Sequence, residues 1–450
     1  MKYEVFTESK KQIDMLSNKI TKNISLLLML VSISLIAQQT PAPKQTTDYT
    51  IEGATAHLGN GEVIENSLLM FHDGKITFVG KAEMKIGRIG KVIDAKGKHV
   101  YPGFIAANAT SGLIEIDAVR ATRDANETGS MNPHIRSLIA YNTESKVTES
   151  LRPNGVLMAQ VTPRGGTLSG TSSVVQFDAW NWEDASIRVD DGIHMNWSSS
   201  ISFGRWWKGE EKGPKPNKNY TKTIEEVRTL FNDAKAYATG NKTPKNLPLE
   251  SVQGLFNGSQ TFFVHVGGEK EITDVVAFCK EMSIDKVVIV HGQNAHKVAE
   301  LLASNNIPVL LDRSHRLPSS DDQDIHFPYK HAKMLIDKGV TVGISMEGGM
   351  ERMNTRNLPF YAGTYAAHGL GKEEALKLIT SNTAKILGID DIVGTLEVGK
   401  DATLFISEGD ALDMRTNILT DAFIQGRKIS LKTHQTKLWK RYMDKYNSQN

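Results

Sequence analysis

The feature that most constrains the fold is an alternation of short apolar runs and amphipathic stretches between residues 100 and 385. Buried strands are indicated by apolar runs rich in β-branched residues, among them TFFVHVGG, DKVVIVHG and GVTVGISMEGG. The stretches between these runs, such as EKEITDVVAFCKEMS, carry apolar residues at helical spacing. Several strand–helix units in a row predict an α/β fold with a parallel sheet, and favour a closed (β/α)8 TIM-like barrel.

The two flanks of this region have a different pattern, in which apolar and polar residues alternate. Residues 48–100 form short alternating runs separated by Asn-Gly and Asp-Gly, the dipeptides of tight hairpin turns. Residues 392–430 return to the same β spacing. We therefore predict one composite β domain built from both flanks, with the barrel over residues 101–391 between them.

Three further segments complete the predicted organisation. Residues 38–47 are a polar, Pro-containing linker. Residues 431–450 form a basic amphipathic helix whose charges we expect to face solvent. Residues 177–220 hold five of the six tryptophans, and we expect a long loop over the barrel mouth.

The N-terminus resembles a secretory signal, because two lysines precede an apolar run over residues 24–37. The run is shorter than the roughly 20 apolar residues of a membrane span. We predict that residues 1–37 are a signal peptide cleaved near Ala37, that the protein is exported to the periplasm, and that it has no stable membrane anchor. An uncleaved anchor is the alternative, and the sequence leaves Met1 and Met15 open as start sites.

Composition excludes several other classes of protein. The formal net charge is only +2, so we expect no nucleic-acid partner. The single cysteine, Cys279, excludes an intramolecular disulfide and a Cys-rich zinc site. Its helical, apolar surroundings favour a packed thiol over a nucleophile.

Two histidines and a carboxylate follow three of the predicted strands. His265 ends TFFVHVGG, His291 ends DKVVIVHG, and Glu347 ends GVTVGISMEGG. The carboxyl ends of barrel strands meet at the mouth where barrel enzymes have their active sites. Imidazole and carboxylate are common metal ligands, so this spacing favours a shared metal site. His194, on the presumed fourth strand, is a further candidate ligand, with a packing histidine as the alternative.

With these motifs the chain resembles the amidohydrolase superfamily, and most closely its imidazolonepropionase-like and secreted bacterial members. The resemblance covers roughly residues 48–430 and is most specific in SNTAKILGI and GTLEVGKDATLFI, which match the family's barrel-closing helix and the strand turn after it. It implies a (β/α)8 barrel with a composite β-sandwich formed by residues 48–100 and 392–430. It also implies hydrolysis of a carbon–nitrogen bond in a small-molecule substrate by metal-activated water. His265 and His291 then match the fifth- and sixth-strand ligands, and Glu347 the eighth-strand catalytic acid.

The first strand departs from the family pattern. Family members carry two histidines there, and alignment on Pro102 and Gly103 places Asn108 and Thr110 at those positions. Both are poor zinc ligands, so the resemblance implies at most one divalent metal, with zinc preferred and no metal as the alternative. Restoring histidine at both positions should then raise the metal content towards two. The presumed third strand, VLMAQVTPRGG, carries Gln160 and no carboxylate ligand.

Three arginines are candidates for substrate binding. Arg164 lies in a Gly- and Ser-rich segment after a strand, where backbone amides can form an anion site. Arg120 and Arg123 follow the first strand and would reach the same mouth, although pairing with neighbouring acids is the alternative.

Two hypotheses remain open from the sequence. The first is a periplasmic amidohydrolase with Glu347 as proton acceptor. The second is a catalytically inactive fold that binds a ligand or pairs with an active paralogue, motivated by Asn108 and Thr110. The sequence identifies neither the substrate nor the oligomeric state, and both a homo-oligomer and a pair with a paralogous amidohydrolase are compatible with it.

Overall fold

Two eight-stranded sheets form the framework of the computed structural model, which describes residues 40–448 except 205, 212 and 349. The predicted signal peptide, residues 1–37, lies outside the described residues. In the part of the chain that is described, no helix is both long and apolar enough to cross a bilayer.

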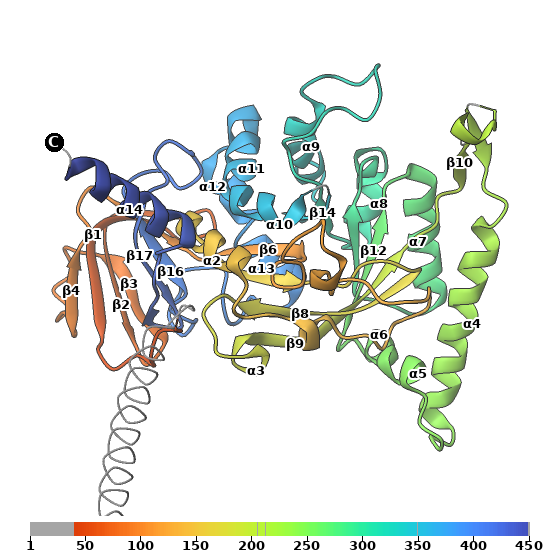
Figure 1. Ribbon diagram of the computed structural model, residues 1–450, viewed down its shortest axis with the longest axis horizontal. Coiled ribbons are helices and arrows are strands. Elements are labelled where there is room, and N and C mark those ends of the chain that lie inside the picture. The colour runs from red at the N-terminus through yellow and green to blue at the C-terminus, as the bar shows by residue number, and fades with distance from the viewer. Residues whose placement is uncertain (1–39, 205, 212, 349, 449–450) are drawn as a thin grey trace, which may run out of the picture. The chain divides into compact units, whose positions relative to one another are not determined.

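The first sheet is made from both flanks of the chain, as their β pattern predicted (Figure 1). Its strands are β1 (Tyr49–His57), β2 (Val63–His72), β3 (Lys75–Lys81), β4 (Lys91–Asp94), β5 (His99–Pro102), β16 (Leu404–Ser407), β17 (Leu419–Ile424) and β18 (Arg427–Lys428). The two flanks meet where β16 pairs antiparallel with β5, and Phe405 lies opposite Tyr101. Hydrogen bonds join all eight strands into one continuous sheet, rather than the two separate sheets of a simple sandwich.

The second sheet is the predicted barrel. In sheet order its strands are β6 (Phe104–Ala109), β7 (Val156–Val161), β8 (Leu168–Gln176), β9 (Ser186–Asn196), β12 (Thr261–Val266), β13 (Val287–His291), β14 (Val309–Leu311) and β15 (Val342–Ile344). A parallel bridge between Ala107 and Ser345 joins the first strand to the last. The amide of Met346 also donates to the carbonyl of Ala107, at 3.0 Å, which nearly closes the barrel.

One barrel strand runs against the others, which the sequence did not predict. β8 pairs antiparallel with both β7 and β9, while the other pairs in this sheet are parallel. The reason is chain length, because parallel strands need a crossover of a dozen or more residues. Only residues 162–167 separate β7 from β8, and only 177–185 separate β8 from β9.

The extra strand corrects two expectations. VLMAQV is the second barrel strand, β7, and not the third. The third is β8, which lies in the Gly- and Ser-rich segment where no strand was predicted. The Trp-rich segment 177–220 is not one long loop, since it contains the whole of β9. After β9 it includes a small antiparallel pair, β10 (Ile201–Phe203) with β11 (Pro214–Pro216).

Helices follow the parallel strands of the second half of the barrel. The described α-helices are α2 (Lys146–Leu151), α3 (Trp182–Ala185), α4 (Tyr220–Thr239), α5 (Leu247–Ser251), α6 (Gln253–Asn257), α7 (Glu269–Glu281), α8 (Ala299–Ser304), α9 (Phe327–Ile336), α10 (Glu351–Asn354), α11 (Leu358–Tyr365), α12 (Lys372–Lys377), α13 (Ser381–Leu387) and α14 (His434–Asn447). α4 buries one apolar stripe, and its Phe231 contacts Phe262 of β12 edge-on, with ring centroids 5.6 Å apart. Burial of such aromatic side chains is a major source of stability in a barrel of this kind.

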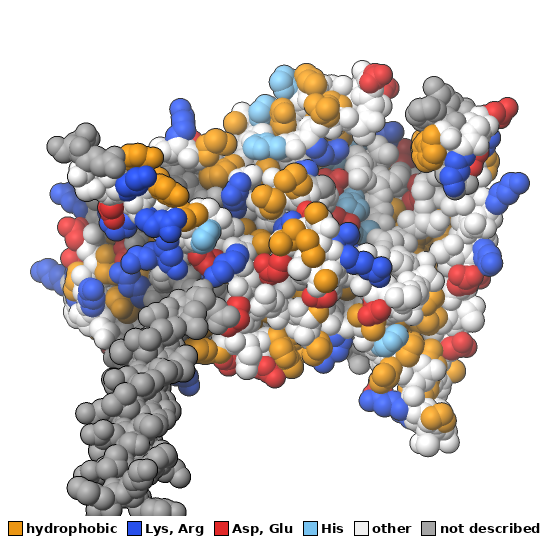
Figure 2. Space-filling view, viewed as in Figure 1, with side chains coloured by type: hydrophobic (Ala, Val, Ile, Leu, Met, Phe, Trp, Pro, Cys, Tyr) orange, Lys and Arg blue, Asp and Glu red, His pale blue; other side chains and the backbone are white. Residues whose placement is uncertain are grey.

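The predicted C-terminal helix is present as α14 and buries none of its residues. Trp439, Tyr442 and Tyr446 are exposed on it among several lysines. Figure 2 shows hydrophobic and basic side chains gathered over this helix.

Candidate active site

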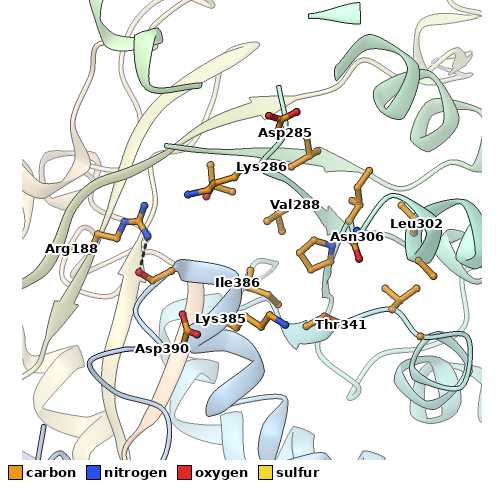
Figure 3. A pocket seen from close by; sticks show the side chains of 18 residues that line it. Arg188, Asp285, Lys286, Val288, Leu302, Asn306, Thr341, Lys385, Ile386 and Asp390 are labelled. Atoms are coloured by element: carbon orange, nitrogen blue, oxygen red, sulfur yellow. Dashed lines mark hydrogen bonds between the residues drawn. The ribbon is translucent and has the colours of Figure 1, made fainter. Parts of the chain in front are cut away.

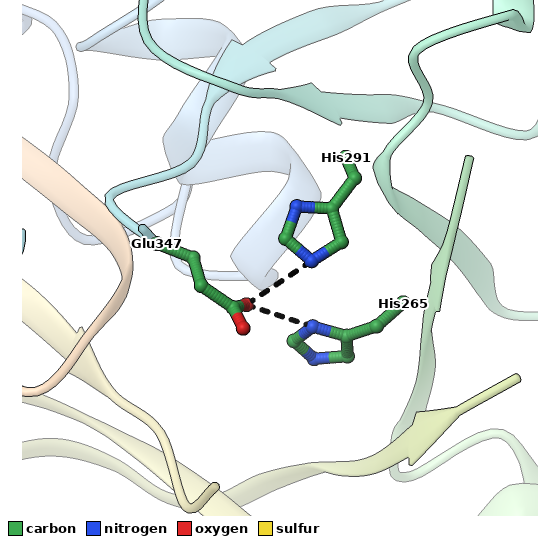
Figure 4. Close-up of side chains that lie close together, drawn as sticks. All are labelled: His265, His291 and Glu347. Atoms are coloured by element: carbon green, nitrogen blue, oxygen red, sulfur yellow. Dashed lines mark ion pairs between the residues drawn. The ribbon is translucent and has the colours of Figure 1, made fainter. Parts of the chain in front are cut away.

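Three side chains predicted from the sequence come together at the carboxyl ends of the barrel strands (Figure 4). His265 lies near the end of β12, His291 ends β13, and Glu347 follows β15. The Oε2 atom of Glu347 is 2.9 Å from Nδ1 of His265 and 3.4 Å from Nε2 of His291. One ligand atom from each residue lies within 4.8 Å of the other two, which is close enough for a single metal ion.

Asp312, which directly follows β14, orients His291. Its Oδ1 atom accepts a hydrogen bond from Nδ1 of His291 at 2.7 Å, and Gln293 donates to its other oxygen at 2.9 Å. The proton on Nδ1 leaves the lone pair of Nε2 directed at Glu347. A carboxylate behind a histidine is the usual arrangement that fixes the tautomer of a metal ligand.

A buried polar chain extends behind His265. Its Nε2 atom is 2.9 Å from Nδ1 of His194, and Nε2 of His194 is 2.9 Å from Oγ of Ser172. Ser172 in turn donates to Asp191 at 2.7 Å. His194 therefore contacts the ring of a candidate ligand and is not one of the three grouped ligands.

Asn108 and Thr110 contact charged protein groups instead of facing open space. Asn108 donates through Nδ2 to Oε2 of Glu347 at 2.8 Å, and its Oδ1 accepts from Arg164 at 2.9 Å. The hydroxyl of Thr110 donates to Glu351, which lies at the start of α10. Arg164 also reaches Glu351, at 3.2 Å. The first-strand positions thus hold a guanidinium group within a hydrogen-bonded network.

These contacts change the predicted role of Arg164. Its guanidinium is largely buried and is paired with Glu351, and it lies 3.8 Å from Glu347. Most of the Gly- and Ser-rich segment in which an anion site was predicted is strand β8. Arg120 and Arg123 are exposed, and they take no part in the hydrogen bonds and ion pairs around the three ligands.

The electrostatics favour an ionised Glu347 and a neutral His265. Burial alone would raise the pKa of Glu347, but the positive charge of Arg164 and the nearby imidazoles hold it well below the usual range. Burial lowers the pKa of His265 and, more strongly, that of His194. Burial opposes protonation of His291 as well, but the hydrogen bond to Asp312 and the negative charges of Asp312 and Glu347 together outweigh burial and raise the pKa.

Backbone strain marks two residues of the site. The φ angles of Asn108 and His291 are 52° and 78°, in a region that residues other than glycine rarely adopt. Such a conformation costs on the order of 1 kcal/mol or more and persists only where the surroundings impose it. The first of these residues is fixed by Arg164 and the second by Asp312.

Four residues of the site were not predicted from the sequence: Ser172, Asp191, Asp312 and Glu351. Asp312 could have been found, because it follows an apolar strand in the same way as His265 and His291. The others gave no local signal, since Ser172 and Asp191 lie inside strands and Glu351 lies beyond the last one.

The buried carboxyl group of Asp191 makes stability depend on pH. Burial raises its pKa from 3.8 to about 6, although Ser172 and Gln160 donate to it. A raised pKa means that the unfolded chain ionises first, so the contribution of Asp191 to stability is full below about pH 4 and is lost as the pH rises through 6.

Wild type should therefore lose stability relative to Asp191→Asn between pH 4 and pH 7. Two pKa units correspond to about 3 kcal/mol of unfolding free energy. Urea unfolding of both proteins at several pH values measures this difference, and a difference that stays constant across the range would contradict the prediction.

A separate cavity of about 480 Å³ lies at the opposite end of the barrel (Figure 3). It is lined by the first residues of β12 and β13 and by the segments that lead into β14 and β15. Arg188 donates to the carbonyl of Gly388 at its edge. None of the three candidate ligands lines this cavity. The active sites of barrel enzymes lie at the other end, where the carboxyl ends of the strands meet.

Comparison with known proteins agrees with the geometry of the site. The amidohydrolase family model matches residues 259–434, a segment that contains His265, His291 and Glu347. A 5'-deoxyadenosine deaminase from Methanobrevibacter smithii is 25% identical over 385 residues, which cover 78% of this chain and 81% of the relative.

Solved structures share the fold. An amidohydrolase from Thermotoga maritima aligns with a TM-score of 0.72 and 22% identity, over 85% of this chain and 99% of that one. An adenosine deaminase from Xanthomonas campestris with bound zinc aligns with a TM-score of 0.52 and 15% identity, over 90% and 100% of the two chains. The second half of the barrel and the C-terminal strands thus match the amidohydrolase family model, and the chain shares its overall fold with a solved amidohydrolase.

Proposed function

We propose that the protein is a hydrolase of carbon–nitrogen bonds that uses one divalent metal, with zinc as the first candidate. His265, His291 and Glu347 would hold the metal. The observation that carries this proposal is the convergence of two imidazole nitrogens on one carboxylate oxygen. Three protein ligands of this kind, with one position left open, are typical of catalytic zinc sites.

The donor atoms fit a metal ion. Nδ1 of His265 is buried and has no hydrogen-bond partner, although it lies 2.9 Å from Glu347. A buried nitrogen without a partner is costly unless another group satisfies it. A metal ion would satisfy this nitrogen and would supply a Lewis acid that activates water at neutral pH.

The two carboxylate oxygens of Glu347 face different groups, so one could bind the metal while the other accepts a proton. Oε2 faces both imidazoles, while Oε1 lies on the side of Arg164, 3.8 Å from its Nε. During hydrolysis the oxygen of water bonds to the substrate carbon, the carbon–nitrogen bond breaks, and one proton moves to the leaving nitrogen. Glu347 would accept that proton and pass it on, in the role predicted from the sequence.

Arg164 explains why one metal would suffice. Its guanidinium binds Asn108, where family members carry a first-strand ligand, and it keeps Glu347 ionised. We infer that this fixed positive charge takes the place of a second metal ion. The alternative of an inactive fold has no support from the site, because three side chains that could hold a metal ion converge there.

The relatives suggest the substrates to test first. One curated relative and one structural neighbour are named as deaminases of adenosine-type nucleosides. A panel should therefore contain purine nucleosides, which lose ammonia, together with simple amides and cyclic amides. Secretion to the periplasm and pairing with a paralogue remain predictions from the sequence.

Protein purified without chelator should contain about one equivalent of metal and should hydrolyse at least one member of this panel. Elemental analysis measures the metal, and release of ammonia or amine measures the reaction. The proposal fails if the protein remains metal-free under excess zinc and turns over none of the substrates.

A further inference from the structure

The polar chain behind His265 is buried throughout and passes through the barrel interior. Its members come from three neighbouring strands: Gln160 on β7, Ser172 on β8, and Asp191 and His194 on β9. Each of these four side chains is at most 1% exposed. Buried polar groups need partners, so the donors and acceptors of the chain can be counted.

The count begins at Gln160, whose orientation is fixed by the backbone. Its Oε1 atom accepts from the amide of Asn108 at 3.1 Å, so its Nε2 atom must point the other way. Nε2 donates to Asp191 at 2.7 Å and to Ser172 at 3.2 Å. Ser172 thus already accepts one hydrogen bond from a group that can only donate.

Ser172 then determines the proton on His194. A hydroxyl has one hydrogen and two lone pairs, and the hydrogen of Ser172 goes to Asp191 at 2.7 Å. Its second lone pair is left for Nε2 of His194, at 2.9 Å. His194 must therefore carry its proton on Nε2, which leaves its Nδ1 as an acceptor.

His194 in turn determines the position of the proton on His265. Its Nε2 atom faces the acceptor Nδ1 of His194 at 2.9 Å, so the proton of His265 lies on Nε2. The remaining nitrogen, Nδ1, then has a free lone pair directed at a carboxylate oxygen of Glu347, 2.9 Å away. Two acceptors that face each other at this distance form a site that favours a metal cation between them.

We propose that Asp191, Ser172 and His194 are positioning residues that force His265 into the tautomer whose Nδ1 atom can bind a metal. Asp312 fixes the tautomer of His291 by a direct hydrogen bond, whereas the tautomer of His265 is fixed by Asp191 through Ser172 and His194. The metal role of His265 rests on the proposed function, but its tautomer is a property of the metal-free chain. Side chains that orient metal ligands typically contribute 10–100-fold to metal affinity.

The tautomer can be measured without metal or activity. Metal-free protein with ¹⁵N-labelled histidine should show His265 protonated on Nε2, with its signals assigned by their loss in His265→Gln. In Ser172→Ala the acceptor for His194 is gone, so His265 should shift at least partly to the Nδ1-protonated form. Ser172→Thr keeps the hydroxyl and should restore the wild-type tautomer.

Zinc titration against a competing chelator gives the second readout. Ser172→Ala should weaken zinc binding by about 10–100-fold, and Ser172→Thr should recover most of the loss. Ser173→Ala is the matched control. Ser173 is an equally buried hydroxyl on the same strand, but it accepts from the amide of Asp190 and does not belong to the polar chain behind His265. Its zinc affinity should be that of wild type.

The outcomes separate this inference from the proposed function. If His265 is protonated on Nδ1 in metal-free wild type, or if Ser172→Ala and Ser173→Ala bind zinc equally well, the positioning chain is wrong while a metal enzyme remains possible. If wild type binds no zinc yet His265 shows the expected tautomer, the proposed function fails and the hydrogen-bond assignment stands.

Discussion

Replacing His265 by alanine should abolish stoichiometric metal binding and with it the hydrolytic activity. Only one imidazole and Glu347 would remain, whereas catalytic zinc sites use about three protein ligands. Because orienting groups alone are worth 10–100-fold, loss of a ligand should weaken zinc binding by more than about a hundredfold. Elemental analysis after dialysis measures the metal, and turnover of the best substrate measures activity.

Two further variants make this result decisive. His291→Ala removes the other imidazole from a more exposed position and should have the same effect, so a folding defect of one variant does not leave the question open. His368→Ala removes a partly exposed imidazole that hydrogen-bonds the carbonyl of Thr364, and should keep both metal and activity. Retention of metal by His265→Ala and His291→Ala would show that the ion lies elsewhere.

The second expected result concerns Arg164 and the first strand. Restoring histidine at positions 108 and 110 should not by itself add a second metal, contrary to the expectation from the sequence. The guanidinium of Arg164 contacts both the side chain and the carbonyl of Asn108, at 2.9 and 2.8 Å. Two unit charges about 4 Å apart repel by about 4 kcal/mol at an effective dielectric constant of about 20, and a dication doubles this.

Adding Arg164→Met to the two histidines should therefore raise the metal content from about one to about two. Arg164→Met alone is the control and should stay at one, since Asn108 and Thr110 are poor ligands. Thermal unfolding with excess zinc checks that the variants fold, because Glu351 loses its buried partner. Two equivalents in Asn108→His/Thr110→His with Arg164 intact would refute the idea that Arg164 replaces a metal.

The same sequence rule that located the ligands explains what was missed. His265, His291 and Glu347 were predictable because each follows a strand, and parallel strands bring their carboxyl ends to one mouth. Ser172 and Asp191 act through the barrel interior, where a strand position gives no sign of which polar neighbour it meets. Contacts of this kind depend on the register between strands, which a single sequence does not specify.

The architecture of the fold was predictable from the sequence, but one of its strands was not. Strand–helix alternation indicated a barrel, and the β-patterned flanks indicated one domain from both ends of the chain. The antiparallel β8 was missed because its run of Ser, Thr and Gly is typical of a turn. Its small side chains are nonetheless buried in the barrel, where Ser172 serves as a hydrogen-bonding partner and not as a turn residue.

The pairing of β5 with β16 has a consequence for the order of events during synthesis. Tyr101 and Phe405 are neighbours in the sheet but about 300 residues apart in the chain. Until residue 407 has left the ribosome, β5 lacks its partner on that edge, and an unpaired edge invites association with other chains. Contacts this distant in sequence also slow folding. The first sheet is therefore completed only after the whole barrel region between β5 and β16 has been synthesised, and β5 remains without this partner during that time.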